Sequence, residues 1–172
     1  DGVTTLDWTF NTCLGLTSIT IPEGVTSLNG AFRGCTGLTS IRIPESVTSM
    51  DHAFYECTSL TSITIPEGVT SMDGAFQGCT GLTSVTIPEG VTSIGDESFS
   101  YCTGLISITL PDSVVTIGSY SFRGCTSLTS ITIPEGVTSI GDLSFKECTK
   151  LTDVTLPDSV VTIGREAFAY CH

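Results

Sequence analysis

Three residue types recur along the whole chain with one shared period. Cysteine stands at positions 13, 35, 57, 79, 102, 125, 148 and 171, so its spacing is 22 up to Cys79 and 23 beyond it. Phenylalanine and proline repeat in the same phase. Periods of roughly 20 to 29 residues are typical of a solenoid, in which each repeat is one coil that buries its apolar side only against its neighbours. The period therefore predicts a single elongated domain, residues 1–172, of about seven coils.

Residues 128–148 show how one coil is built. Ile131 and Ile133 alternate with hydroxyl residues, and this period of two predicts a short strand with its aliphatic side chains inside and its hydroxyls outside. Pro134 ends the strand, because proline has no amide N–H to donate to a neighbouring strand. Short turns or 3-10 segments then carry Phe145 into the interior. The expected fold is mainly β: a curved, right-handed solenoid with one parallel strand ladder.

The pattern resembles the leucine-rich repeats of the BspA-like family. Coils of that family read Leu-x-x-Ile-x-Ile-Pro and then Val-x-x-Ile-Gly-x-x-Ala-Phe-x-x-Cys, and several coils of this chain have Ser in place of the Ala. Proline, phenylalanine and cysteine recur together in phase, so the resemblance covers the whole chain. It implies a curved solenoid with parallel strands. It also implies a secreted or cell-surface protein with a role in adhesion.

The coils have two lengths. The later coils carry a glycine after the isoleucine of the return segment, at Gly95, Gly118, Gly141 and Gly164, and the earlier coils lack it. The shorter repeats, with a spacing of 22, therefore run to about Pro88, and the longer repeats, with a spacing of 23, follow. A shorter return segment, on the side of the coil away from the strand, alters the curvature of the solenoid. We therefore expect a change of bend near residues 88–96.

The two ends of the chain do not look like the polar caps that solenoids need. The first coil begins within its motif at Asp1, and the last stops at His172, one residue after its cysteine. This favours a segment of a longer array, or an array with atypical caps. Exposed end coils with unpaired edges also favour end-to-end self-association.

Charge and composition exclude several classes of function. Only 14% of the residues are charged and about fifty are Thr or Ser, so the surface must consist largely of hydroxyls. The net charge is −12 with six Lys and Arg, which repels a phosphate backbone or an anionic membrane surface. No stretch approaches the roughly 18 apolar residues of a membrane span. We therefore expect neither nucleic acid nor a membrane as a partner.

The eight cysteines suggest either disulfides or a ladder of free thiols. Equivalent residues in successive coils lie about 4.8 Å apart with parallel side chains, whereas a disulfide needs Cβ atoms that face each other at about 3.5–4.5 Å. This geometry favours a reduced, buried ladder, in which cysteine packs as a small hydrophobe. No close Cys-x-x-Cys pair indicates a metal site.

One acid follows each strand proline, and together these acids form a column of seven like charges. Calcium would relieve their repulsion if carboxylates and carbonyls converged, but one carboxylate per coil is a poor cage. We expect solvated turn residues, with no metal and no cofactor. The column comprises Glu23, Glu45, Glu67, Glu89, Asp112, Glu135 and Asp158.

The outward strand positions form ranks of Ser-x-Thr that resemble the surfaces of ice-binding solenoids. Arg42 and Asp153 interrupt these ranks, and a curved face is not the flat plane that ice requires. Threonine also favours strands without any ligand, because it is β-branched. Ice binding is therefore a distant third among the functions considered. Arg42 and Asp153 are candidate contacts on the concave face.

The coils differ mainly at three outward positions that flank the buried phenylalanine. All four tyrosines, the only tryptophan and three of the six cations lie there. Tyr, Trp and Arg dominate binding hot spots, because each offers a large rigid contact area with a polar group. Drift of unconstrained surface positions is the alternative explanation. The candidate binding residues are Trp8, Arg33, His52, Tyr55, Tyr101, Tyr120, Arg123 and Lys146.

Catalysis has little support in the sequence. A nucleophile needs a positioned base, and His52 and His172 are too few and too isolated to provide one. Two functions remain. The first is a surface binding or adhesion module that contacts a protein or glycan through the variable positions, and the second is a structural or self-assembling scaffold, natural or engineered. We expect the first, without enzymatic activity.

Overall fold

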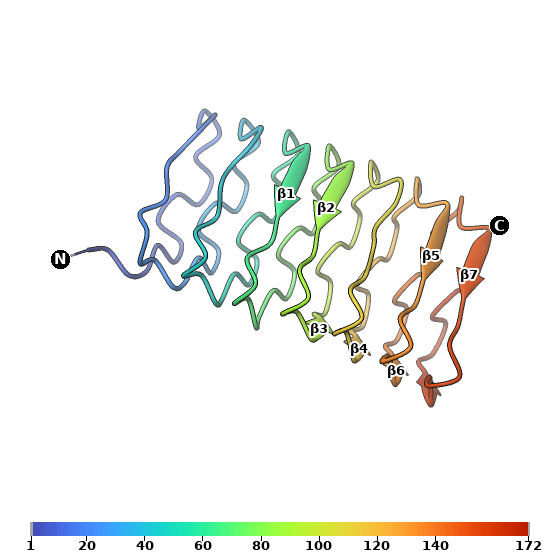
Figure 1. The fold of residues 1–172 in the computed structure, drawn as a ribbon. Helices are drawn as coiled ribbons and strands as arrows, with labels where there is room; N and C mark the ends of the chain where they lie inside the picture. The colour runs from blue at the N-terminus through green and yellow to red at the C-terminus, as the bar shows by residue number, and fades with distance from the viewer. Residues whose placement is uncertain (1, 172) are drawn as a thin grey trace.

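The chain folds as a parallel β-solenoid, seen here in a computed structural model that describes residues 2–171. Successive coils lie side by side along one axis, and the two ends of the chain lie at opposite ends of the array (Figure 1). Short strands, extended segments and turns form the coils, and residues 2–171 contain no helix that could span a membrane. The predicted leucine-rich-repeat solenoid is confirmed. Asp1 and His172, which mark the predicted ends of the array, lie outside the described residues.

One parallel ladder lies where the alternating Ile-x-Ile segments predicted it. Its strands join equivalent residues of successive coils, so that Ile63 pairs with Val85. In the earlier coils the same column contains an isolated parallel bridge between Thr20 and Arg42. The strand pairs are β1 (Ser62–Thr64) with β2 (Ser84–Thr86), and β5 (Ser130–Thr132) with β7 (Asp153–Thr155).

A second parallel ladder lies at another corner of the coil (Figure 1), so the prediction of one ladder is wrong. The Val-x-x-Ile segment after the turn also buries its apolar residues, and its extended backbone hydrogen-bonds from coil to coil. Its strands, in order along the sheet, are β3 (Ser93–Ile94), β4 (Thr116–Ile117), β6 (Ser139–Ile140) and β8 (Thr162–Ile163). Of the short turns or 3-10 segments expected after each strand, the turns are present, and residues 2–171 contain no 3-10 helix.

The second ladder changes from isolated bridges to named strands where the repeat length changes from 22 to 23 residues. Isolated bridges join Thr5 to Ser27, Ser27 to Ser49 and Ser49 to Ser71, whereas named strands begin at β3. The change falls next to the first inserted glycine, Gly95. The change of bend expected near residues 88–96 stays a prediction.

Phenylalanine forms the central column of the core. Ring centroids of successive coils, from Phe10 to Phe168, lie 5.1 to 5.6 Å apart with nearly parallel planes. The rings from Phe32 to Phe145 are fully buried, and the two end rings are half-buried. Each coil therefore stabilises its neighbours through stacked aromatic contacts as well as through apolar burial.

The cysteines form a second buried column beside these rings. All eight thiols are free, and from Cys35 onward each S–H donates to the carbonyl of the phenylalanine in the preceding coil at 3.0 to 3.2 Å. Burial raises the pKa of Cys57 and of Cys148 to about 12, which suppresses the reactive thiolate at neutral pH. The predicted burial is confirmed from Cys35 to Cys148 but is wrong for Cys13, which lies exposed in the first coil.

A column of Asp and Asn side chains also joins the coils, and it was not predicted from the sequence. In each pair, Oδ1 accepts a hydrogen bond from the backbone N–H of the equivalent residue one coil later. The distances are 2.7 to 3.0 Å for the pairs Asp7–Asn29, Asn29–Asp51, Asp51–Asp73, Asp73–Asp96, Asp96–Ser119 and Asp142–Arg165. The side-chain oxygens of this column thus accept hydrogen bonds from backbone N–H groups that have no backbone carbonyl as partner.

Asp73 gives the column a predictable pH dependence. Burial raises the pKa of Asp73, and the charges of Asp51 and Asp96 raise it further. The folded state therefore binds this proton more tightly than the unfolded state does, so the contribution of Asp73 to stability falls as pH rises from below its unfolded pKa, about 3.9, through the higher folded value. Asp73→Asn, with the residue type that Asn29 already has in this column, is expected to raise the melting temperature at pH 7 by about 1–3 °C.

Thermal melts followed by circular dichroism at pH 3, 5 and 7 test this expectation. The gain should shrink toward pH 3, where the carboxyl of Asp73 is protonated in both states. Asp112→Asn removes one charge from an exposed turn outside the column and serves as the control. A lower melting temperature for Asp73→Asn at pH 7 would show that the carboxylate is needed in its charged form.

Candidate binding surfaces

The variable strip consists of three columns beside the buried phenylalanines, and two of them have a left-handed backbone. Glycine occupies these two columns in some coils, at Gly30, Gly34, Gly74, Gly78 and Gly124. In the other coils, non-glycine residues take the same conformation with φ of 53 to 65°: Trp8, Thr12, His52, Glu56, Glu97, Tyr101, Tyr120, Leu143, Glu147, Glu166 and Tyr170. This conformation costs a non-glycine residue about 1–2 kcal/mol. Large side chains therefore stand where glycine would relieve backbone strain.

Some of these side chains lie over a glycine of the next coil. A Cβ atom on Gly30 would lie 2.5 Å from the ring of Trp8, and one on Gly124 would lie 2.6 Å from the ring of Tyr101. His52 covers Gly74 in the same way. The side chains consequently lie along the strip, yet Trp8 and Tyr101 keep 51% and 39% of their surface exposed. Each bulky residue and its glycine form one structural unit.

The structure brings Arg33, His52 and Tyr55 together in a first cluster. The guanidinium carbon of Arg33 lies 4.3 Å from the centroid of the Tyr55 ring, a distance at which a cation and a ring face attract. The ring of His52 meets that of Tyr55 edge-on, with centroids 6.4 Å apart. All three side chains are half-buried, and the buried Nδ1 of His52 has no hydrogen-bond partner among the described residues.

A second cluster assembles around Arg123. Its guanidinium carbon lies 5.4 Å from the ring centroid of Tyr101 and 5.9 Å from that of Tyr120. Its Nη2 atom lies 3.4 Å from Oε1 of Glu147. Two aromatic rings and one carboxylate therefore surround the guanidinium, whose buried Nε has no hydrogen-bond partner among the described residues.

Lys146 extends the second cluster toward the end of the array. Its Nζ atom lies 2.7 Å from Oε2 of Glu166 and 5.3 Å from the ring centroid of Tyr170. The hydrogen bond to Glu166 raises the pKa of Lys146, and the same bond lowers the pKa of Glu166. Glu147, Glu166 and Tyr170 are partners that the sequence did not single out, although each lies in a variable column. Trp8 joins neither cluster and lies over Gly30 near the start of the array.

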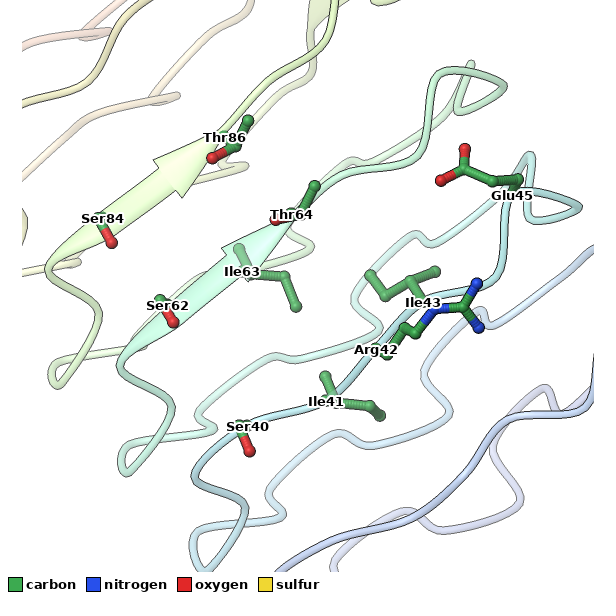
Figure 2. A pocket seen from close by; sticks show the side chains of 10 residues that line it. All are labelled: Ser40, Ile41, Arg42, Ile43, Glu45, Ser62, Ile63, Thr64, Ser84 and Thr86. Atoms are coloured by element: carbon green, nitrogen blue, oxygen red, sulfur yellow. The ribbon is translucent and has the colours of Figure 1, made fainter.

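The strand face carries a hollow of about 530 Å³. Figure 2 shows Ser62 and Ser84 in one row of hydroxyls and Thr64 and Thr86 in a second, with Arg42 beside them. The volume of this hollow falls in the range of small-molecule sites, but five of its ten lining residues are Ser or Thr and none is aromatic. A second hollow of about 300 Å³ lies farther along the same face, between residues 107 and 134. These hollows depart from the flat plane that ice binding requires.

The two candidates on the strand face do not meet. Arg42 lines the larger hollow, and its Nη1 atom lies 2.6 Å from Oε1 of Glu23, which raises the pKa of Arg42. Asp153 begins β7 near the other end of the array. The seven turn acids are all exposed, and within residues 2–171 no three His, Cys, Asp or Glu side chains converge on a metal position.

Comparisons with known proteins identify the repeat. A family model described as a BspA type leucine rich repeat region, in six copies, matches residues 4–74 and 50–172. No curated protein matches the chain. A leucine-rich repeat protein from Eubacterium ventriosum is 30% identical, with a TM-score of 0.81 over 90% of this chain and 42% of its own. The chain therefore spans less than half the length of that protein.

Two further solved structures match nearly the whole chain. The leucine-rich repeat protein of T. pallidum is 30% identical, with a TM-score of 0.65 over 98% of this chain and 70% of its own. A leucine-rich cell surface protein from Faecalibacterium prausnitzii is 32% identical, with a TM-score of 0.50 over 96% of this chain and 62% of its own. Both similarities therefore span nearly every coil of the array.

Proposed function

Because the chain belongs to the BspA-type leucine-rich-repeat family, we propose that it is a non-enzymatic module at the cell surface or outside the cell, which binds a protein or glycan through the variable strip. Repeat solenoids of this kind are generally binding or scaffold modules rather than catalysts. The description of the F. prausnitzii protein as a cell surface protein supports the location.

Backbone strain beneath the aromatic residues is the observation that carries the proposal. Tyr101 and Tyr120 stand at positive φ, in columns where other coils have glycine. Strained backbone persists where the surroundings over-determine it, and it concentrates at binding and catalytic sites. Unconstrained drift would favour the residue with the least strain, so the two tyrosines are better explained by a role of their side chains.

The second cluster also has the chemistry of a binding hot spot. Tyr101 and Tyr120 offer rigid aromatic surface, and Arg123 between them offers hydrogen-bond donors held in place by Glu147. Residues of these types contribute most of the energy in protein interfaces when they are already ordered before binding. Aromatic faces with adjacent hydrogen-bond donors suit sugar rings as well as protein side chains.

A double variant, Tyr101→Gly with Tyr120→Gly, tests the role of the strip. It removes both rings and relieves strain, so the protein should remain folded and its melting temperature should change little. The purified chain is first screened against arrays of glycans and purified extracellular matrix proteins. For any partner found, we expect the dissociation constant to rise about 30-fold or more, as for the loss of a hot-spot residue.

Arg42→Ala on the strand face is the matched control and should leave that dissociation constant unchanged. The opposite result, with binding lost in Arg42→Ala and kept in the tyrosine variant, would move the site from the strip to the strand face. Retention of every partner by the tyrosine variant contradicts the proposal.

A self-assembling scaffold is a second candidate function, and one observation favours it. Successive coils join through one repeated set of backbone hydrogen bonds, as the N–H of Phe10 donates to Ala31 at 2.9 Å and that of Phe145 donates to Ala167 at 2.7 Å. Backbone groups that join coil to coil in this way can also join a coil of another copy, since an unpaired strand edge is a template for pairing. Contact of this kind between copies would lengthen the array.

A further inference from the structure

Asparagine or aspartate directly before glycine is the most readily modified pair of residues in a polypeptide, because glycine has no side chain to keep its nitrogen away from the neighbouring side-chain carbonyl. The chain contains three such pairs, and two of them, Asn29-Gly30 and Asp73-Gly74, lie wholly within the described residues. In both pairs the first residue belongs to the Asp and Asn column, and the glycine belongs to the variable strip. The two pairs therefore occupy equivalent places in the solenoid, two coils apart.

One residue of the following coil holds both reacting groups of each pair. Oδ1 of Asn29 accepts a hydrogen bond from the N–H of Asp51 at 2.8 Å, and the N–H of Gly30 donates to the carbonyl of the same Asp51 at 2.8 Å. Asp96 makes the same two bonds to the second pair, at 3.0 Å to the side chain and 2.8 Å to the glycine. The glycine nitrogen and the side-chain carbonyl are therefore each engaged with the next coil and cannot react with each other while the coils stay joined.

The preceding coil covers each glycine with a ring. Trp8 lies over Gly30, where an added Cβ atom would come 2.5 Å from the indole, and His52 lies over Gly74 so closely that an added Cβ atom would collide with Nδ1. Both glycines are buried, although they stand in the outer strip. A glycine between a ring on one side and a hydrogen-bonded coil on the other has no room to close a five-membered ring with the residue before it.

We propose that Asn29 and Asp73 are sites of spontaneous modification, and that Trp8 and His52 protect them by covering the glycine that follows each. In the reaction, the glycine nitrogen loses its proton and bonds to Cγ of the preceding residue, and ammonia leaves from Asn29 or water from Asp73. Water then opens the ring to aspartate or to isoaspartate, which has one more methylene in the main chain. Isoaspartate displaces the Oδ1 acceptor, so the column loses its bond to the following coil. Trp8 and His52 thereby have a role that does not require a ligand.

Long incubation of the purified chain at neutral pH, followed by peptide mapping with mass spectrometry that distinguishes isoaspartate from aspartate, tests the proposal. Both sites should react at least about tenfold more slowly in the folded chain than in urea, because reaction through an opened state follows the small population of that state. Trp8→Ala should raise the rate at Asn29 about threefold or more and leave the rate at Asp73 unchanged, since only the local opening becomes easier. His52→Ala should do the reverse.

Tyr101→Ala is the matched control, because it removes a ring that covers Gly124, and the residue before that glycine is Arg123, which cannot cyclise. Both rates should keep their wild-type values in this variant. Alanine is used throughout, since glycine in place of Trp8 or His52 would create a new Asp-Gly pair. Equal acceleration of both sites by either variant, or wild-type rates in both, would overturn the covering role of the two rings. Reaction as fast in the folded chain as in urea would overturn the protection altogether.

Discussion

Replacing Phe99 with alanine is expected to lower the free energy of unfolding by about 3–5 kcal/mol. The ring of Phe99 is fully buried and stacks on Phe76 at 5.3 Å and on Phe122 at 5.4 Å. Its removal leaves a cavity between two rings that neighbouring coils hold in place, so the gap cannot close without disturbing the ladders on either side. In a linear array this also weakens the coupling between the coils before and after it.

Urea denaturation followed by circular dichroism measures this loss. Phe10→Ala is the internal control, because Phe10 is half-buried and, among the described residues, stacks on Phe32 alone, so its loss should be clearly smaller. Broken coupling should also appear as a broader transition in Phe99→Ala than in Phe10→Ala. A loss below about 1 kcal/mol for Phe99→Ala would mean that the aromatic column does not hold the coils together.

Gly141→Ala is expected to destabilise the protein by about 3 kcal/mol, the upper part of the range for overpacked cores. Gly141 is one of the glycines inserted in the longer coils, and its N–H donates to the carbonyl of Ile117 at 2.8 Å. A Cβ atom at this position would lie 2.5 Å from the backbone nitrogen of Ser119 and 2.6 Å from the carbonyl carbon of Gly118. Backbone cannot move aside as a flexible side chain does, so the two coils must separate and lose the hydrogen bond.

Gly15→Ala provides the matched control, because no atom lies within 4 Å of an added Cβ there and its φ is not positive. It should be neutral within about 0.5 kcal/mol. Thermal and urea unfolding of the two variants side by side measure the difference. Equal stability of the two would show that the inserted glycines are not required for the close approach of the coils.

The buried residues of each coil were predictable from the sequence, because they all follow one repeat period. Ile131, Ile133 and Phe145 are buried as their alternation and phase indicated. The second ladder was missed because a two-residue strand offers no alternation long enough to separate it from a turn. The Asp and Asn column repeats at the period of the coils, so its spacing could be found in the sequence. Its role could not, because polar residues beside a turn are usually exposed to solvent, and only the structure shows that their oxygens accept hydrogen bonds from backbone N–H groups.

The candidate site was predictable only in part, for a related reason. Equivalent positions in adjacent coils must lie close together, and this is why Arg33 and Tyr55 meet. The same rule separates Arg42 from Asp153, which lie several coils apart. The left-handed backbone of the variable columns depends on the turn that each coil makes. Its one sign in the sequence was the recurrence of glycine at positions that other coils fill with tyrosine or glutamate.

Chemical modification of the buried thiols reports where the solenoid has opened. A small alkylating reagent should react quickly with the exposed thiol of Cys13 and more slowly with the partly exposed thiol of Cys171. The thiols between them should become reactive only when the coils around them separate. The number of modified sulfur atoms therefore counts how many coils have opened, and their positions tell from which end the fraying began.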